Sequence, residues 1–130
     1  MHVTIDGFGG DPARLSDLQL VRGVFDFCRE EMGLEPVVDI LIFPYSGINP
    51  KDSGISGFAL LEAGHLTIHT FTNHGQIWID YFGDQVFDGL KIKRMIENEF
   101  GITNTRVHNL PRGREYSIPD DQASTRAGTV

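Results

Sequence analysis

The chain has 130 residues, 40% of them hydrophobic and 22% charged, which suits one globular core and excludes two separate ones. Its net charge of −7 at pH 7 argues against nucleic-acid binding, which needs a positive face. No apolar stretch is long enough to span a bilayer, and no basic segment followed by an apolar block marks a secretory signal. We therefore expect a cytoplasmic protein that does not bind membranes.

Hydrophobic periodicity predicts the helices and strands in chain order. Residues 2–6 alternate as a strand does, and an S-x-x-Q capping box at Ser16 predicts a helix that ends at Gly33. Cys28, the single cysteine, falls on the apolar side of this helix, where we expect a buried thiol and no internal disulfide. We expect a strand at residues 36–43 and three closely spaced strands at 55–63, 65–72 and 76–82. An amphipathic helix at 86–100 and a last strand at 103–110 follow. We expect one domain over residues 1–118 and a disordered tail over 119–130.

The register of the central hairpin follows from its turn. A turn at Asn73 and His74 places His69 opposite Trp78 and Thr67 opposite Asp80, which keeps the apolar side of each strand on a common face. That face holds Leu66, Ile68, Ile77, Ile79 and Tyr81, and it would support two helices. The opposite face holds His65, Thr67, His69, Phe71, Trp78, Asp80 and Phe82, and the first strand could add His2, Thr4 and Asp6.

The second face has two interpretations. Its aromatic side chains need cover and its His and Asp side chains need partners, so a second sheet from another subunit would cover it and leave a polar pocket between the layers. The alternative is a solvated face with isolated aromatic residues.

One segment carries a family resemblance. The stretch from Gly54 to Phe82, G-I-S-G-F-A-L-L-E-A-G-H-L-T-I-H-T-F-T-N-H-G-Q-I-W-I-D-Y-F, aligns without gaps to a pattern of G-V-T-G, a short strand, E-S-H-x-x-I-H-T-W-P-E-x-G, and a strand ending D-x-F-T-C-G. It resembles the core of bacterial S-adenosylmethionine decarboxylases. The H-x-x-x-D of the first strand and the R-G of Arg112 and Gly113 extend the resemblance over nearly the whole chain.

The resemblance implies a fold and an activity. The fold class is α/β (α+β), a two-layer sandwich with an antiparallel sheet and two helices on one face, and two protomers stack their sheets face to face. Members of the family cleave themselves before the serine of E-S-H, which becomes a pyruvoyl group. That group forms a Schiff base with the substrate amine and draws electrons as carbon dioxide leaves, and the product feeds spermidine synthesis.

Three departures fall where this chemistry takes place. Gly64 stands at the serine position and has no hydroxyl to begin the acyl shift, so we expect no pyruvoyl group and no other cofactor. Ala63 replaces the preceding glutamate, and Asp84 replaces the cysteine to which the family assigns proton transfer. Decarboxylation by a pyruvoyl group is therefore not expected.

Other positions of the ligand pocket are retained or altered. The resemblance places His69 at the family's second histidine, Phe71 at an adenine-stacking tryptophan, and Phe43 as a candidate second stacking ring. Asn73 replaces a glutamate, which alters a ribose contact. His65 and Trp78, on the same face, and Glu62, as a rim residue or a shifted substitute for the lost carboxylate, complete the expected ligand-binding set.

The remaining polar residues have structural interpretations. The register places Asp80 between His65 and His69, where it would orient one or both imidazoles. These two histidines would stand about 13 Å apart along the strand, so no metal site is expected. Asp84 is interpreted as the N-cap of the second helix.

Two classes of function remain open. The favoured one is an unprocessed homologue that binds S-adenosylmethionine or a related nucleoside, or that serves as a partner subunit linked to polyamine metabolism, as a homodimer or in a mixed dimer with an active homologue. The alternative is an enzyme of different chemistry with His69, Asp80, Asp84 or His65 as acid and base. A decarboxylase-type role in spermidine biosynthesis is also open.

Overall fold

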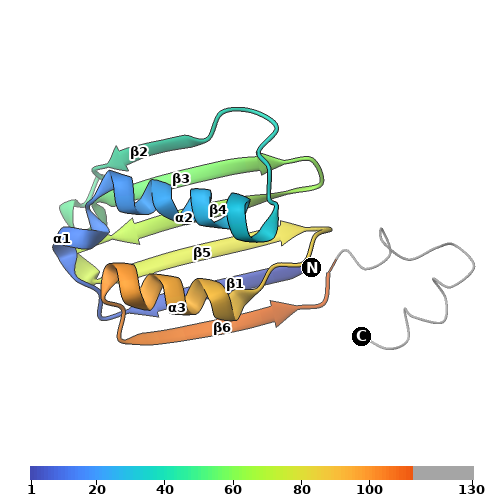
Figure 1. Ribbon diagram of the computed structural model, residues 1–130. Helices are drawn as coiled ribbons and strands as arrows, with labels where there is room; N and C mark the ends of the chain where they lie inside the picture. Colours follow the sequence, from blue (N-terminus) through green and yellow to red (C-terminus); the bar gives the residue numbers. More distant parts are fainter. Residues whose placement is uncertain (113–130) are drawn as a thin grey trace, which may run out of the picture.

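The computed structural model describes residues 1–112, and these form an antiparallel sheet with its main helices on one side (Figure 1). The strands are β1 (His2–Phe8), β2 (Leu41–Tyr45), β3 (Gly54–Leu61), β4 (Gly64–Phe71), β5 (Gln76–Gly83) and β6 (Asn104–Leu110). The helices are α1 (Pro12–Leu15), α2 (Leu18–Met32) and α3 (Gly89–Phe100), with the single 3-10 turns η1 (Pro50–Asp52) and η2 (Thr72–His74). The expected tail, residues 119–130, lies outside the described residues.

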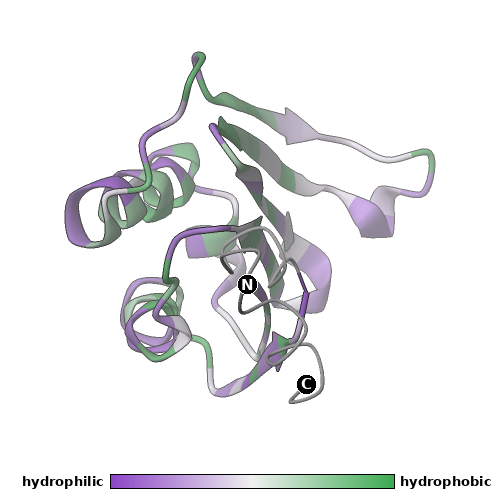
Figure 2. Cartoon of the chain, turned by 90° about the vertical axis from the view of Figure 1, so that its right-hand side faces the viewer, coloured by the Kyte–Doolittle hydropathy of each residue, from purple (hydrophilic) through white to green (hydrophobic). Residues whose placement is uncertain are grey.

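The sheet has six strands in the order β2-β3-β4-β5-β1-β6, and every neighbouring pair is antiparallel. The first strand is therefore internal, between β5 and the C-terminal β6. Figure 2, turned by 90°, shows α2 and α3 on the same side of this sheet. The predicted two-layer fold is confirmed, and the short α1 is an addition to it.

The core lies between the sheet and these helices because both surfaces are apolar there. The strand residues predicted to support the helices, Leu66, Ile68, Ile77, Ile79 and Tyr81, are buried as expected. From the helices they meet Val21, Val24, Phe25, Cys28, Ile92, Ile96 and Phe100. Among the described residues no helix is long and apolar enough to cross a membrane.

The predicted hairpin register is confirmed. His69 lies opposite Trp78 and Thr67 opposite Asp80 in the β4–β5 pair. The connection is the single turn η2, and Gly75 follows it with φ 64°, a left-handed conformation that favours glycine.

Both predicted N-caps were wrong, although the predicted helix ends, at Gly33 and at residue 100, are confirmed. The first long helix is capped by Asp17, whose carboxylate accepts hydrogen bonds from two backbone N–H groups, because Ser16 is already used at the end of α1. The second is capped by Asp88 in the same way. Asp84 lies four residues earlier, in the connection that leaves β5, so it caps no helix.

The start of the second expected strand also differs. The strand predicted at 36–43 begins only at Leu41, because residues 36–40 form the connection that carries the chain from α2 to the edge of the sheet. Val37 makes one backbone hydrogen bond there, from its N–H to the Leu60 carbonyl at 2.9 Å.

Candidate functional site

The face of the sheet that none of the described helices covers, here called the open face, carries the polar and aromatic residues singled out in the sequence. Its strand partners follow the register in rows, so Phe43, Ser56, His69, Trp78, Asp6 and Arg106 form one row across all six strands. Its large hydrophobic side chains are partly exposed: Leu41 62%, Phe43 49%, Tyr45 47%, Phe58 38%, Leu60 42% and Trp78 46%. The face is therefore neither an ordinary core nor an ordinary solvated surface.

His69 and its neighbours occupy the middle of the open face. The His69 Nδ1 lies 2.9 Å from the Ser56 hydroxyl oxygen on β3. The Phe71 and Trp78 rings lie with their centroids 4.4 Å apart and their planes tilted by 52°. The Trp78 Nε1–H donates to the Gln76 side-chain oxygen at 3.0 Å. One side of the proposed stacking ring is thus already in contact with another aromatic ring.

The partner predicted for Asp80 was wrong. Its carboxylate lies 2.8 Å from Nε2 of His2 on β1, and neither His65 nor His69 contacts it by a hydrogen bond within the described residues. The other His2 nitrogen, Nδ1, lies 3.3 Å from a guanidinium nitrogen of Arg112. Because a guanidinium only donates, Nδ1 must accept, so Nε2 carries the proton and donates to Asp80.

His65 is held by aromatic rings rather than by a carboxylate. Its ring centroid lies 6.2 Å from that of Phe58 and 6.1 Å from that of Phe82. The guanidinium carbon of Arg112 lies 4.1 Å from the centroid of the Phe82 ring, a cation–π contact. This end of the open face is therefore a connected group of rings with one guanidinium.

A shallow hollow of about 290 Å³ lies on the open face. It is lined by Thr4, Asp6, Thr67, His69, Trp78, Ile79 and Asp80. The sequence register placed the β4 and β5 members of this set together. It left the contribution of β1 undecided, because nothing local in the sequence identifies the neighbours of the first strand.

A second hollow, of about 400 Å³, lies at the β3–β4 turn. It brings together Glu62, Ala63 and Asp84, which flank the position of the missing serine, with Tyr81. The Tyr81 hydroxyl donates to the Gln85 carbonyl at 2.8 Å, and burial, with a smaller effect of the Asp84 charge, raises its pKa. The sequence predicted Tyr81 only as a core residue, and the structure adds that it lines this hollow.

Gly64 lies at the start of β4 with φ 153°. A Cβ atom at this position would overlap the Phe82 carbonyl oxygen and lie 2.6 Å from the Gly83 Cα. Both are backbone atoms, so no side-chain rotation relieves the overlap. The local backbone is adapted to glycine.

The candidate residues of the sequence fall in two separate places. Gly64 and Phe71 lie at opposite ends of β4, about 23 Å apart at a rise of ~3.3 Å per residue. Glu62 and Asp84 belong to the Gly64 end, whereas Asn73 follows Phe71, with its amide 3.4 Å from the Pro50 carbonyl oxygen. Phe43 lies beside Ser56, on the same row as His69. A single chain does not bring all these residues together.

Among the described residues no group of three His, Cys, Asp or Glu side chains could hold a metal ion. Three residues outside the predicted site set lie beside it: His2 contacts Asp80, Ser56 contacts His69, and Arg112 contacts His2 and Phe82. The spacing of His2 and Asp6 was visible, but the pairing of β1 with β5 was not.

The sheet with two long helices on one side is a known architecture. The crystal structure of the adenosylmethionine decarboxylase from Aquifex aeolicus VF5 superposes with a TM-score of 0.62 at 19% identity, over 82% of this chain and 86% of that one. This likeness concerns the fold.

Sequence comparison extends the likeness to a family. The family described as S-adenosylmethionine decarboxylase matches residues 1–113. The S-adenosylmethionine decarboxylase proenzyme of Shouchella clausii is 29% identical over 127 residues, covering 97% of this chain and 94% of that protein. Proenzyme 2 of Halalkalibacterium halodurans is 32% identical over 114 residues, covering 86% and 84%. The chain belongs to the S-adenosylmethionine decarboxylase family, as its motifs predicted.

Proposed function

We propose that this chain is an unprocessed member of the family, which remains one polypeptide and binds S-adenosylmethionine or a related nucleoside without decarboxylating it. The observation that carries the proposal is Gly64. Self-cleavage requires a hydroxyl oxygen to attack the carbonyl carbon of residue 63, and then elimination from the resulting ester to leave a pyruvoyl group. Glycine supplies no hydroxyl, so neither step occurs.

The surroundings of Gly64 support the same conclusion. The backbone of β5 occupies the space that a side chain at position 64 would need. Ala63 and Asp84 line the adjoining hollow in place of the carboxylate and the thiol that the family resemblance leads one to expect. Without a pyruvoyl carbonyl no Schiff base forms with the substrate amine, and the electrons released with carbon dioxide have no acceptor.

Features of the open face favour a nucleoside ligand. The half-exposed rings of Phe43 and Trp78 offer stacking surfaces for an adenine. Asp6 and Asp80 line the hollow beside Trp78, where carboxylates attract the sulfonium and ammonium charges of S-adenosylmethionine. The hollow is small for such a ligand, since nucleotide-sized sites usually measure about 300–1,000 Å³.

A second chain would enlarge this site. The open face is a broad, partly exposed apolar surface of the kind that marks protein–protein contacts. Because Gly64 and Phe71 lie at opposite ends of β4, a ligand that touches both groups needs them from two chains. We therefore include in the proposal a cytoplasmic dimer through the open face, formed by two copies or with an active homologue, in the service of polyamine metabolism.

The proposal is tested by covalent state and by binding. Intact-mass measurement should give one chain of 14.5 kDa, without a carbonyl that reacts with hydroxylamine. Calorimetric titration with S-adenosylmethionine should show saturable binding, and the recovered ligand should be unchanged. Two fragments divided before Gly64 would contradict the lack of processing, and absence of binding at millimolar ligand would contradict the nucleoside site.

A second candidate is an enzyme of different chemistry on the same face. The observation in its favour is the Asp80–His2 pair at 2.8 Å, since an imidazole oriented by a carboxylate is a common general acid or base. His69, His65 and Asp84 remain candidates for the same work. Formation of any product from S-adenosylmethionine by the purified protein would favour this candidate, and loss of that product in His2→Ala and Asp80→Asn would locate it.

A further inference from the structure

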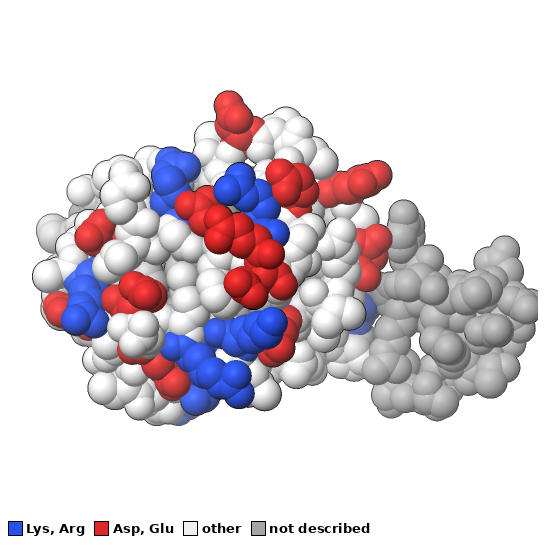
Figure 3. Space-filling model, viewed as in Figure 1, with Lys and Arg blue, Asp and Glu red and all other residues white. Residues whose placement is uncertain are grey.

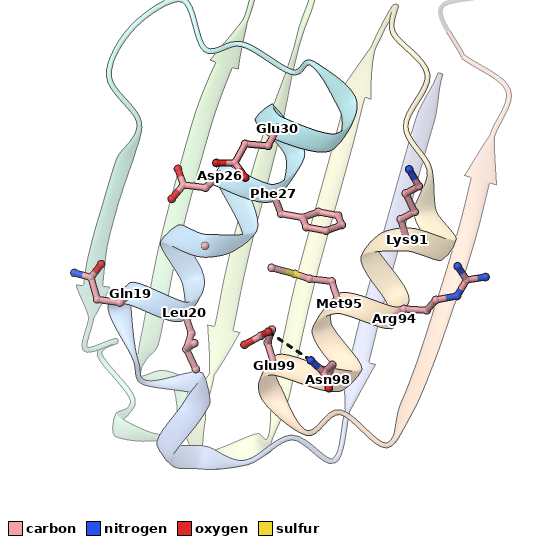
Figure 4. Close-up of a pocket in the computed structure, with 11 residues that line it drawn as sticks. Gln19, Leu20, Asp26, Phe27, Glu30, Lys91, Arg94, Met95, Asn98 and Glu99 are labelled. Carbon is pink, nitrogen blue, oxygen red and sulfur yellow. Dashed lines mark hydrogen bonds between the residues drawn. The ribbon is translucent and has the colours of Figure 1, made fainter.

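A groove of about 610 Å³ runs between α2 and α3, on the side of the molecule away from the open face. Figure 4 shows Leu20 and Phe27 of α2 and Met95 of α3 pointing into the space between the helices. Gly23 also lines the groove, and a Cβ atom there would meet nothing within 4 Å. The middle of the groove is therefore apolar and open.

Charges of opposite sign flank this apolar strip. Asp26 and Glu30 lie on α2, and Lys91 and Arg94 lie on α3, while the acidic Glu99 of α3 lines the other end of the groove. Figure 4 shows Asp26 and Arg94 pointing away from the groove, to opposite sides. Figure 3 shows a run of acidic side chains above a group of basic ones in the middle of this face.

These charges are little used inside the chain. Asp26 makes an i,i+3 pair with Arg29 at 3.8 Å, and both side chains are nearly half exposed. Within the described residues, Glu30, Lys91 and Arg94 belong to no ion pair. An exposed pair such as Asp26–Arg29 contributes little to stability, so it leaves Asp26 available to another partner.

The two helices run in opposite directions, as Figure 1 shows. The second half of α2, with Asp26 and Glu30, therefore lies beside the first half of α3, with Lys91 and Arg94. The acidic flank and the basic flank are at the same end of the groove, on its two sides.

We propose that this groove is a self-association surface, occupied by the same groove of a second copy about a two-fold axis parallel to it. Rotation about such an axis exchanges the α2 side and the α3 side of the groove. It leaves the direction along the groove unchanged, so the same end of the groove coincides in both copies. It therefore places the acidic flank of each copy over the basic flank of the other, with Leu20, Phe27 and Met95 of both copies in the middle. An apolar centre with a charged rim is the usual organisation of a protein interface, and a two-fold contact uses one patch twice.

The charge pattern favours a second copy over an unrelated partner. A chain with a net charge of −7 repels its copies, so a contact between copies needs local attraction of this kind. The groove and the open face lie on opposite sides of the sheet, so this contact neither requires nor prevents pairing through the open face. It is independent of the proposed nucleoside binding.

The test uses two charge-reversal variants. The first carries Asp26→Lys and Glu30→Lys, and the second carries Lys91→Glu and Arg94→Glu. Each variant alone places like charges opposite one another, so light scattering at micromolar concentration should report a mass at least twofold below that of the wild-type chain. An equimolar mixture should recover the wild-type mass, because the basic α2 of the first variant then lies over the acidic α3 of the second.

The matched control carries Glu31→Lys and Asp39→Lys, exposed acidic positions that do not line the groove. It changes the net charge as much as the first variant and should keep the wild-type mass. Circular dichroism checks that all variants are folded. Unchanged mass in both reversal variants would overturn the proposal, and so would a loss of mass that mixing does not restore. Neither result would bear on binding of S-adenosylmethionine, which titration measures separately.

Discussion

A side chain at position 64 would meet backbone rather than flexible atoms, namely the Phe82 carbonyl and the Gly83 Cα. We expect Gly64→Ser to remain one chain and to unfold at lower denaturant concentration. The cost should exceed that of Gly33→Ser by about 1–3 kcal/mol, the usual penalty of overpacking. Gly33 is the matched control because it also has positive φ, 68°, but an added Cβ there meets nothing within 4 Å. We infer that the site lacks more than the serine hydroxyl. Self-cleavage of Gly64→Ser would contradict this.

Nucleoside binding is best tested by removing the aromatic ring of Phe71. Phe71→Ala should weaken binding of S-adenosylmethionine by about 1–3 kcal/mol, the range for base–aromatic stacking. His69→Ala should weaken it less, because the family resemblance assigns that side chain to the reacting end of the substrate. Titration calorimetry measures both. Equal losses in the two variants would argue against a stacking role for Phe71.

Burial raises the pKa of the Cys28 thiol from 9.0 to about 12. The unfolded chain therefore loses this proton at lower pH than the folded chain does, so the thiol lowers stability as pH rises from 9 towards 12. The slope approaches about 1.4 kcal/mol per pH unit where only the unfolded thiol is ionised. Denaturant unfolding across this pH range measures the effect. The free energy of unfolding of the native chain should fall with pH more steeply than that of Cys28→Ala, by that slope. Parallel curves for the two proteins would show that Cys28 does not titrate differently on unfolding.

At the scale of elements, the N-cap of α3 is a single side chain with a clear function. The Asp88 carboxylate accepts from the Leu90 and Lys91 N–H groups at 3.1 and 3.2 Å. We expect Asp88→Ala to lower the free energy of unfolding by about 1 kcal/mol, whereas Asp84→Ala, outside the helix, should change it little. Denaturant midpoints of the two variants give the comparison. A larger effect at Asp84 would indicate that Asp84 caps the helix, as the sequence predicted, and would contradict a capping role for Asp88.

The elements also show what the sequence could and could not predict. The β4–β5 register was predictable because a short turn and strict alternation determine it locally. The caps were not, because Ser16 and Asp17 are adjacent candidates and two aspartates precede α3. The partner of Asp80 depended on a strand that lies more than seventy residues away in sequence. Local patterns carry no information about such a pairing.

The candidate site was predictable in composition but not in arrangement. Family motifs identified Gly64, His69 and Phe71, and the alternation placed the last two on one face. The length of the predicted strand already implied that Gly64 and Phe71 are far apart along β4. That the candidate residues therefore fall in two separate places became evident only from the arrangement of the sheet. None of the described elements covers the open face, so the proposed cover by a second chain could not be predicted from the local patterns of one chain.

At the scale of the whole molecule, the open face should bring two chains together. We expect pairing through the open face at micromolar concentration, and Trp78→Glu should lower the measured mass at least twofold because a charge then lies in the covered surface. Leu90→Glu is the control, since Leu90 is 57% exposed on α3 and belongs neither to the open face nor to the groove. Light scattering gives the masses. A monomeric wild-type chain would exclude both proposed contacts at that concentration.

The place of β1 between β5 and β6 also determines when the chain can complete its fold during synthesis. His2 pairs with Phe82 and with Leu110, so the first strand made is among the last to find its neighbours. At ~5–20 residues per second, β1 waits on the order of 4–16 seconds before its first partner strand has been synthesised. During that interval Val3 and Ile5, which end fully buried, have no sheet to join. The nascent chain should therefore be sensitive to protease and dependent on chaperones until β5 and β6 have been synthesised.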